Sequence, residues 1–239
     1  MSTADPSTPP SPKSNRRGLL IAIAAVIVLV LAGGGFYGYR AYSASQTTGN
    51  LNTPSPLGDI ALGPADARVT IIEYASMTCP HCAVFTKETF PKLKAAYVDT
   101  GKVRYIFREF PLDQLALLGA QLARCIAKGD GPKYFGAIDV LFATQDEWAN
   151  NKPIEPLKRL TKQLGMNDGE FEACANNETI GKGIIATRDY AYDKLKVNAT
   201  PSFFVNGQLL QGEASLEDFA KIIDPILNGS GAGAPAAKK

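Results

Sequence analysis

The chain has 239 residues, with 25 Lys and Arg side chains, 23 Asp and Glu side chains, one His and four Cys. The first 40 residues hold four of the basic and one of the acidic side chains, so the remainder carries a net charge of −1. A near-neutral domain has no electrostatic reason to seek the phosphates of nucleic acid. The charge balance therefore excludes a nucleic-acid-binding protein.

An uncharged apolar segment, residues 19–39, lies near the N-terminus. As a helix of about 31 Å, at ~1.5 Å per residue, it is long enough to cross the core of a bilayer. Three basic residues precede it and one follows it, so the positive-inside rule places residues 1–18 in the cytoplasm. We predict a retained single-pass anchor, with a cleaved signal peptide as the alternative. Both interpretations place the rest of the chain outside the cytoplasm.

Two further segments have the composition of connections rather than of a core. Residues 40–58 are polar and contain Pro54 and Pro56, which is typical of a flexible linker. Residues 229–239 contain only Gly, Ala, Ser, Pro and Lys, which is typical of a disordered tail. The sequence therefore predicts one domain of ordinary size over residues 59–228.

The first predicted core element is a strand over residues 69–74, where β-branched and apolar side chains follow one another. Glu73 interrupts this run. An ionised carboxylate is costly in a strand that is buried on both faces, unless it has a partner. We therefore take Glu73 as a candidate functional acid, and a salt-bridged strand residue is the alternative.

The motif Cys79-Pro80-His81-Cys82 follows the strand and precedes a helix predicted over residues 83–97. Cys79 then lies at the N-terminal end of the helix, where unpaired N–H groups and the helix dipole favour a thiolate over a thiol. Two thiols at this spacing can close into a disulfide and so carry two electrons. The motif therefore predicts an activated dithiol.

Two other interpretations of this motif are weaker. A zinc site needs four protein ligands, or three and a water, and the chain offers one His and two further cysteines that are distant and not paired in spacing. A purely structural disulfide across two residues would remove little chain entropy. We expect neither a metal nor a cofactor.

The later elements continue the alternation of strand and helix. A second strand, parallel to the first, is predicted over residues 103–111, and residues 112–197 are helical in pattern. The first helix of this region has an apolar stripe, formed by Leu115, Leu118, Leu122, Cys125 and Ile126. A hairpin around Asn206-Gly207 and a last helix capped by Ser215 complete the domain.

The two remaining cysteines, Cys125 and Cys174, fall on apolar positions of the helical region. In an oxidising compartment we predict that they form a structural disulfide. A loop of about 50 residues would gain about 4 kcal/mol in the chain-entropy model. Two buried free thiols are the alternative.

Two stretches resemble DsbA-type thiol–disulfide oxidoreductases, whose thioredoxin fold is interrupted by a helical insertion. The first ends in Ala75-Ser-Met-Thr-Cys-Pro-His-Cys82, and its Pro80-His81 dipeptide looks like that of DsbA itself. The second, Ala199-Thr-Pro-Ser-Phe-Phe-Val-Asn-Gly207, is similar to the cis-proline loop of the family. The resemblance implies an α/β, thioredoxin-like fold with an all-helical insertion at about residues 112–197, preceded by one transmembrane helix.

The resemblance also implies roles for the site residues. Cys79 is the exposed nucleophile and Cys82 is its buried partner, while His81 stabilises the Cys79 thiolate. Glu73 lies where similar proteins have a buried acid that assists proton movement around the second cysteine. Pro201 is expected to follow a cis peptide bond and to face the sulfur of Cys79.

Thr200 departs from the family pattern. The best-known DsbA enzymes have Val before the cis-proline, whereas Thr is frequent in isomerases and reductases of the superfamily. The Pro-His dipeptide favours an oxidase and Thr200 favours an isomerase or reductase kept reduced by a membrane electron donor. A third possibility is an anchored chaperone that is not an enzyme.

The leading expectation is an extracytoplasmic oxidase that inserts disulfide bonds into exported proteins. Its substrates would be the thiols of those proteins, and a DsbB-like membrane quinone reductase would reoxidise it. We expect a monomer in the bacterial inner membrane, with a cytoplasmic N-terminus and a catalytic domain in the periplasm or its equivalent.

Overall fold

The computed structural model describes residues 50–229. The tail predicted at residues 1–18, the transmembrane helix predicted at residues 19–39 and nearly all of the tail predicted at residues 229–239 lie outside this range. Among the described residues, no helix combines the length and the apolar character needed to cross a bilayer.

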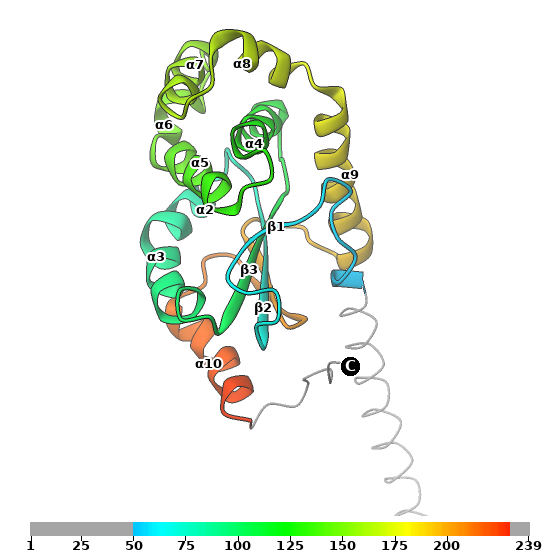
Figure 1. Cartoon of the computed structure of the whole chain (residues 1–239). Helices are drawn as coiled ribbons and strands as arrows, with labels where there is room; N and C mark the ends of the chain where they lie inside the picture. Colours follow the sequence, from blue (N-terminus) through cyan, green and yellow to red (C-terminus); the bar gives the residue numbers. More distant parts are fainter. Residues whose placement is uncertain (1–49, 230–239) are drawn as a thin grey trace, which may run out of the picture. The chain divides into compact units, whose positions relative to one another are not determined.

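Within residues 50–229, five strands form one mixed sheet in the order β1-β3-β2-β4-β5 (Figure 1). β2 and β3 are parallel, and the other neighbouring pairs are antiparallel. The sequence predicted all of these strands except β1, which is too short to show a period. The strands are β1 Ile60–Leu62, β2 Val69–Ala75, β3 Val103–Glu109, β4 Ser202–Val205 and β5 Gln208–Gln211.

β2 lies between β3 and β4, and its side chains are buried on both faces of the sheet. Because successive side chains of a strand point to opposite faces, Ile71 and Ala75 belong to the larger apolar core, which also contains side chains of α3 and α10. Ile72 and Tyr74 belong to a second core with side chains of α9. Figure 1 shows α3 and α10 on one side of the sheet and α9 on the other.

The chain between β3 and β4 forms helices and no strand, which confirms the predicted insertion at about residues 112–197. In Figure 1 these helices gather beyond one end of the sheet, and α9 returns along its side. The helices are α4 Gln114–Ala127, α5 Gly131–Ala143, α6 Gln145–Trp148, α7 Ile154–Gln163, α8 Asp168–Ala175 and α9 Glu178–Leu195, and α10 Leu216–Leu227 follows β5.

The helical connection between β2 and β3 begins earlier than predicted, at Pro80 instead of residue 83. Proline is tolerated at the first helical position because that position needs no N–H donor. The connection also contains two π-helical turns, which the sequence pattern did not indicate. Its parts are α2 Pro80–Val84, η1 Phe85–Thr89, α3 Phe90–Leu93 and η2 Lys94–Val98.

The buried face of α4 differs from the predicted stripe. Leu122 is fully buried, but the other members of the stripe are only half-buried. Small side chains make up most of the buried face instead, and they let neighbouring elements approach closely. A Cβ atom on Gly119 would lie 3.2 Å from side-chain atoms of both Met77 and Trp148. The buried small residues are Ala116, Gly119, Ala120, Ala123 and Ala127.

The described part of the predicted linker, residues 50–58, packs against the domain instead of extending away from it. Leu51 is 3% exposed. The buried Arg108 guanidinium donates to the carbonyls of Leu51 and Thr53, at 3.1 Å each, and forms an ion pair of 2.8 Å with Asp59. A polar, Pro-containing segment is ordered here because a tertiary partner binds its backbone carbonyls.

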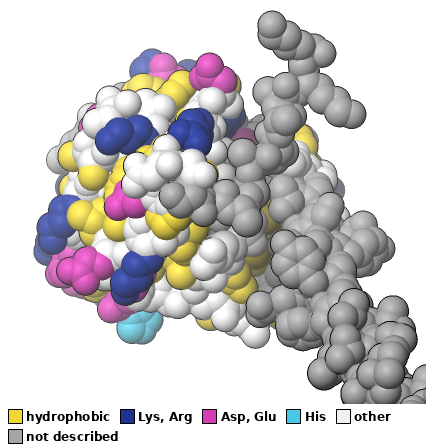
Figure 2. Space-filling model, turned by 90° about the horizontal axis from the view of Figure 1, so that it is seen from below, with side chains coloured by type: hydrophobic (Ala, Val, Ile, Leu, Met, Phe, Trp, Pro, Cys, Tyr) yellow, Lys and Arg dark blue, Asp and Glu magenta, His cyan; other side chains and the backbone are white. Residues whose placement is uncertain are grey.

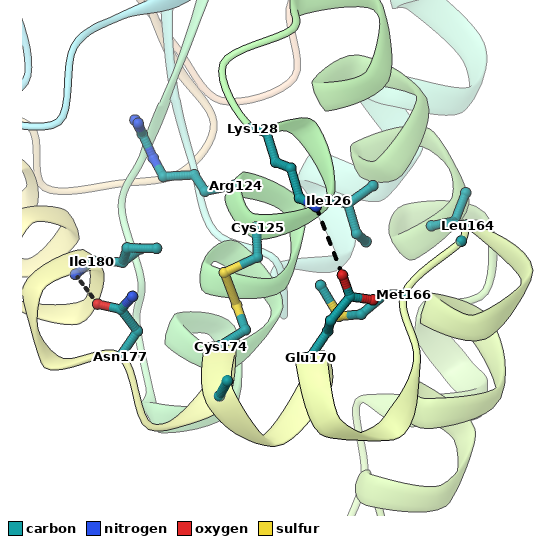
Figure 3. Close-up of a pocket in the computed structure, with 12 residues that line it drawn as sticks. Arg124, Cys125, Ile126, Lys128, Leu164, Met166, Glu170, Cys174, Asn177 and Ile180 are labelled. Carbon is teal, nitrogen blue, oxygen red and sulfur yellow. Dashed lines mark hydrogen bonds and ion pairs between the residues drawn. A yellow bond between two sulfur atoms is a disulfide. The ribbon is translucent and has the colours of Figure 1, made fainter.

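The predicted disulfide between Cys125 and Cys174 is present, so the alternative of two free thiols is wrong. The bond joins α4 to α8 across 49 residues of sequence. It lines a pocket of about 410 Å³ between these helices, with Lys128 and Glu170 forming an ion pair of 3.7 Å beside it (Figure 3).

Removing this disulfide tests how far it stabilises the insertion. Replacing both Cys125 and Cys174 by Ala should lower the free energy of unfolding by about 4 kcal/mol, because the unfolded chain regains the entropy of a 49-residue loop. Urea denaturation of the full chain in detergent measures the difference. The matched control replaces Cys79 and Cys82 by Ala, because these two thiols are free in this structure and close no loop. Equal losses in the two variants would contradict the loop-entropy argument.

Candidate active site

The motif Cys79-Pro80-His81-Cys82 lies where the carboxyl end of β2 meets the start of α2. Cys79 is the N-cap of the helix, with φ −78° and ψ 120°. Both cysteines are free thiols in this structure. Cys79 is 6% exposed and Cys82 is fully buried. Solvent therefore reaches Cys79 before Cys82, in the order that the sequence predicted, although Cys79 is itself largely enclosed.

Hydrogen bonds to sulfur strongly favour a thiolate at Cys79. The Cys82 thiol makes the largest contribution and lowers the pKa of Cys79 to about 5, against the opposing effect of burial. The Thr200 side chain and the backbone N–H groups of Cys82 and His81 act in the same direction. These N–H groups are the unpaired donors that the start of a helix provides.

Cys82 has the opposite electrostatic environment. Burial, followed by its hydrogen bond to Cys79 and by the charge of Glu73, raises the pKa of the Cys82 thiol well above its usual value. At neutral pH one sulfur of the pair is therefore ionised while the other holds its proton.

The loop that carries Thr200 and Pro201 faces Cys79 from β4. The Thr200–Pro201 peptide bond is cis, as predicted. The Cys79 thiol donates to the Thr200 carbonyl at 3.3 Å. The Thr200 hydroxyl is buried and has no hydrogen-bond partner within the described residues. The Thr200 side chain lowers the pKa of Cys79, which is the direction expected of a hydroxyl that can donate to a thiolate.

Glu73 lies in the apolar core beneath the cysteines and is 2% exposed. Its Oε2 accepts a hydrogen bond of 2.6 Å from the Tyr105 hydroxyl, and its Oε1 has no partner among residues 50–229. Burial raises the pKa of the carboxyl to about 8, more than the Tyr105 hydrogen bond lowers it. No cation of the described chain pairs with Glu73, so the salt-bridged alternative is wrong for this part of the protein.

Tyr105 is a site residue that the sequence analysis missed. It lies on β3 beside Ile71 of β2 and is 1% exposed. Burial, followed by the nearby Glu73 carboxyl, raises the pKa of its phenol well above the usual value. A Tyr in an apolar strand looks like an ordinary core residue, so only the pairing of β2 with β3 reveals its contact with Glu73.

His81 is exposed, in agreement with its place on the first turn of α2 (Figure 2). Its Nδ1 lies 2.5 Å from a carboxylate oxygen of Glu213, which follows β5. This hydrogen bond raises the pKa of His81 above its usual value. The imidazole near Cys79 is thus paired with the Glu213 carboxylate, a contact that the sequence did not predict.

Two further observations concern the surroundings of this site. Within residues 50–229 there is no group of three or more His, Cys, Asp or Glu side chains that could hold a metal ion. The pocket beside the Cys125–Cys174 disulfide contains no residue of the Cys79 motif or of the Thr200–Pro201 loop (Figure 3).

Comparison with known proteins places the chain in a known family. A family model described as thioredoxin matches residues 55–225. A protein of Rickettsia felis named protein-disulfide oxidoreductase is 36% identical over 170 residues, which cover 71% of this chain and 60% of that protein. The chain thus spans about 60% of the length of that curated relative. Disulfide bond formation protein D of Bacillus cereus is 29% identical over 224 residues, covering 90% of this chain and 99% of that protein.

A solved structure agrees with this placement. The crystal structure of a variant of alpha-DsbA1 from Wolbachia pipientis superposes with a TM-score of 0.71 at 32% sequence identity. The match covers 77% of this chain and 96% of that one.

The raised pKa of Glu73 predicts a pH-dependent stability that a Glu73→Gln variant should lack. The folded protein holds this proton up to about pH 8, whereas the unfolded chain releases it near 4.5. Between these values the folded state binds more protons, so the free energy of unfolding falls as the pH rises, by up to about 5 kcal/mol. The contribution is complete below the unfolded pKa and lost above the folded one.

Urea denaturation of both proteins across this pH range provides the measurement. The difference between their profiles therefore reports the titration of Glu73 and of the cysteines and Tyr105 whose pKa values depend on its charge. Parallel profiles would show that Glu73 ionises normally in the folded protein.

Proposed function

The chain belongs to the thioredoxin family, as a member of its DsbA type, and from this membership we propose that it is a thiol–disulfide oxidoreductase that forms disulfide bonds in exported proteins. The observation that carries the proposal is the separation of the two thiol pKa values. The pKa of Cys79 is lowered to about 5, and the pKa of Cys82 is raised well above its usual value. A pair with these properties has one sulfur suited to leave and one suited to hold a proton.

The proposed reaction begins with the oxidised Cys79–Cys82 pair. A substrate thiolate attacks the Cys79 sulfur, because Cys82 is fully buried. The bond between the cysteines breaks, a mixed disulfide forms between substrate and Cys79, and Cys82 leaves as a thiolate. A second substrate thiol loses its proton to solvent and attacks the substrate sulfur of the mixed disulfide. Cys79 leaves as a thiolate, the substrate is oxidised by two electrons, and the enzyme pair is reduced.

We assign Glu73 the role of proton donor to the departing Cys82. Burial raises the pKa of its carboxyl to about 8, so it is neutral at lower pH. Both Glu73 and Cys82 are buried, and a charge on Glu73 would raise the pKa of Cys82. A buried neutral acid can deliver a proton where solvent does not reach. Glu73 then takes up a proton from solvent and is neutral again in the reduced protein. The same path in reverse removes the Cys82 proton when the pair is reoxidised.

The direction of exchange depends on how far the reduced state is stabilised. A stable Cys79 thiolate favours the reduced protein, and as in DsbA enzymes this makes the oxidised protein a strong oxidant. The Thr200 hydroxyl adds to that stabilisation, which supports an oxidase on physical grounds. An isomerase or reductase is the second candidate, since those enzymes frequently have Thr before the cis-proline.

The location and partners that we propose follow from the sequence. Residues 19–39 would anchor a monomeric protein in the bacterial inner membrane, with its N-terminus in the cytoplasm and residues 59–228 outside. Thiols of exported proteins would be the substrates, and a DsbB-like quinone reductase in the membrane would reoxidise the pair. The support is the uncharged apolar segment with its basic flank.

The redox equilibrium of the pair with glutathione tests the proposed direction. We expect an equilibrium far more oxidising than that of thioredoxin, whose potential is about −270 mV. Thr200→Val should shift it toward the reducing side, because the thiolate loses a donor. Alkylation and mass spectrometry of the full chain in detergent measure the oxidised fraction.

Two outcomes would favour another function. A potential close to that of thioredoxin would favour the isomerase or reductase. Full cellular activity of a Cys79→Ser variant would favour a chaperone.

The role of Glu73 predicts the pH dependence of thiol exchange. In the natural protein, release of Cys82 should slow as the pH passes about 8, where Glu73 loses its proton. Glu73→Gln should lack this inflection, and Glu73→Asp, which retains a carboxyl, should show one. Stopped-flow reduction of the oxidised protein by a small thiol, corrected for the thiolate fraction of that thiol, gives the profile. Identical profiles for the natural protein and Glu73→Gln would exclude the role.

A further inference from the structure

A side chain of the helical insertion reaches the backbone of the Cys79 loop. Gln145, the first residue of α6, is 8% exposed. Its Nε2 donates to the Met77 carbonyl at 2.8 Å and to the Cys79 carbonyl at 3.1 Å. One buried amide therefore holds two carbonyls of the segment that leads into α2.

The position of Gln145 is itself fixed by packing. Trp148, at the other end of α6, is fully buried and donates from Nε1 to the Leu141 carbonyl at 2.8 Å. The absence of a side chain at Gly119 lets Met77 and Trp148 approach the same point of α4. The short helix is thereby held between α4 and the Cys79 loop.

We infer that Gln145 is a positioning residue that stabilises the Cys79 thiolate through the backbone. This inference rests on the proposed function, because it concerns the same dithiol. Gln145 binds the Cys79 carbonyl and not the sulfur. That carbonyl also accepts the Ala83 N–H at 3.2 Å, which is the first helical bond of α2. Two donors on one carbonyl fix the extended backbone of the N-cap.

The fixed backbone matters because the sulfur depends on donors with defined directions. The N–H groups of His81 and Cys82 and the Cys82 thiol lower the pKa of Cys79 as hydrogen-bond donors to its sulfur. A cap residue free to rotate would lose part of these bonds, since hydrogen bonds weaken steeply when they are misaligned. Gln145 thus connects the insertion to the ionisation of Cys79.

The insertion provides a matched control in Gln121. This Gln is 6% exposed, and its Nε2 also donates to two backbone carbonyls, those of Cys174 at 3.3 Å and Asn177 at 3.1 Å. These carbonyls lie at the end of α8 and before α9, and they do not belong to the Cys79 loop. Gln121→Met and Gln145→Met therefore remove the same kind of interaction, and only one of them borders the dithiol.

The experiment compares the two variants with the natural full chain in detergent. For each protein we would measure urea denaturation, the pKa of Cys79 from the ultraviolet absorbance of its thiolate, and the equilibrium with glutathione. Both variants should lose stability. Gln145→Met should raise the pKa of Cys79 by about one unit, a tenfold change in its ionisation constant, and shift the glutathione equilibrium toward the reducing side. Gln121→Met should change neither the ionisation constant of Cys79 nor the glutathione equilibrium constant by more than about twofold.

The outcomes separate this inference from the proposed function. If the natural protein has a lowered Cys79 pKa and Gln145→Met leaves that pKa unchanged, only the role of Gln145 is overturned. An ordinary Cys79 pKa in the natural protein would overturn the proposed function itself. If Gln145→Met does not fold, Gln145→Asn decides, because its shorter amide cannot span both carbonyls. The inference requires that it raise the pKa of Cys79.

Discussion

The thiolate at Cys79 is stable because the titratable groups closest to it retain their protons. Cys82, Glu73 and Tyr105 all lie in the apolar core under the start of α2, and burial raises the pKa of each. A low-dielectric site tolerates one charge far better than two. The protonated neighbours remain neutral, and the Cys82 thiol can donate to the thiolate instead of competing with it.

The surrounding fold brings three separate segments together at Cys79. β2 ends at the loop that carries Cys79, the Thr200–Pro201 loop approaches from β4, and α6 of the insertion binds the loop from a third side through Gln145. The insertion is in turn attached to the sheet by a buried ion pair of 2.5 Å between Arg124 of α4 and Glu109 of β3. Such a pair contributes little net stability, but removal of one partner would leave an uncompensated buried charge.

Local patterns predicted much of the fold, and the errors have physical causes. The β-branched run of β2 and the Asn206-Gly207 turn are signals that act over a few residues, so the strands they define were found. The composition of residues 50–58 predicts a linker, but the segment is ordered by Arg108, which is distant in sequence. The stripe on α4 was misjudged because small residues pack closely there, and hydropathy alone gives them little weight.

The sequence by itself determined the dithiol motif, its place at a helix start, the acidic residue in the central strand and the cysteine pair of the insertion. These features depend on neighbours along the chain or on residue chemistry. Only the tertiary structure decided that Tyr105 binds Glu73, that Glu213 pairs with His81, and that Gln145 holds the Cys79 backbone. Each of these contacts joins residues more than 30 positions apart, and no local pattern records which distant side chain the folded chain brings to a given atom.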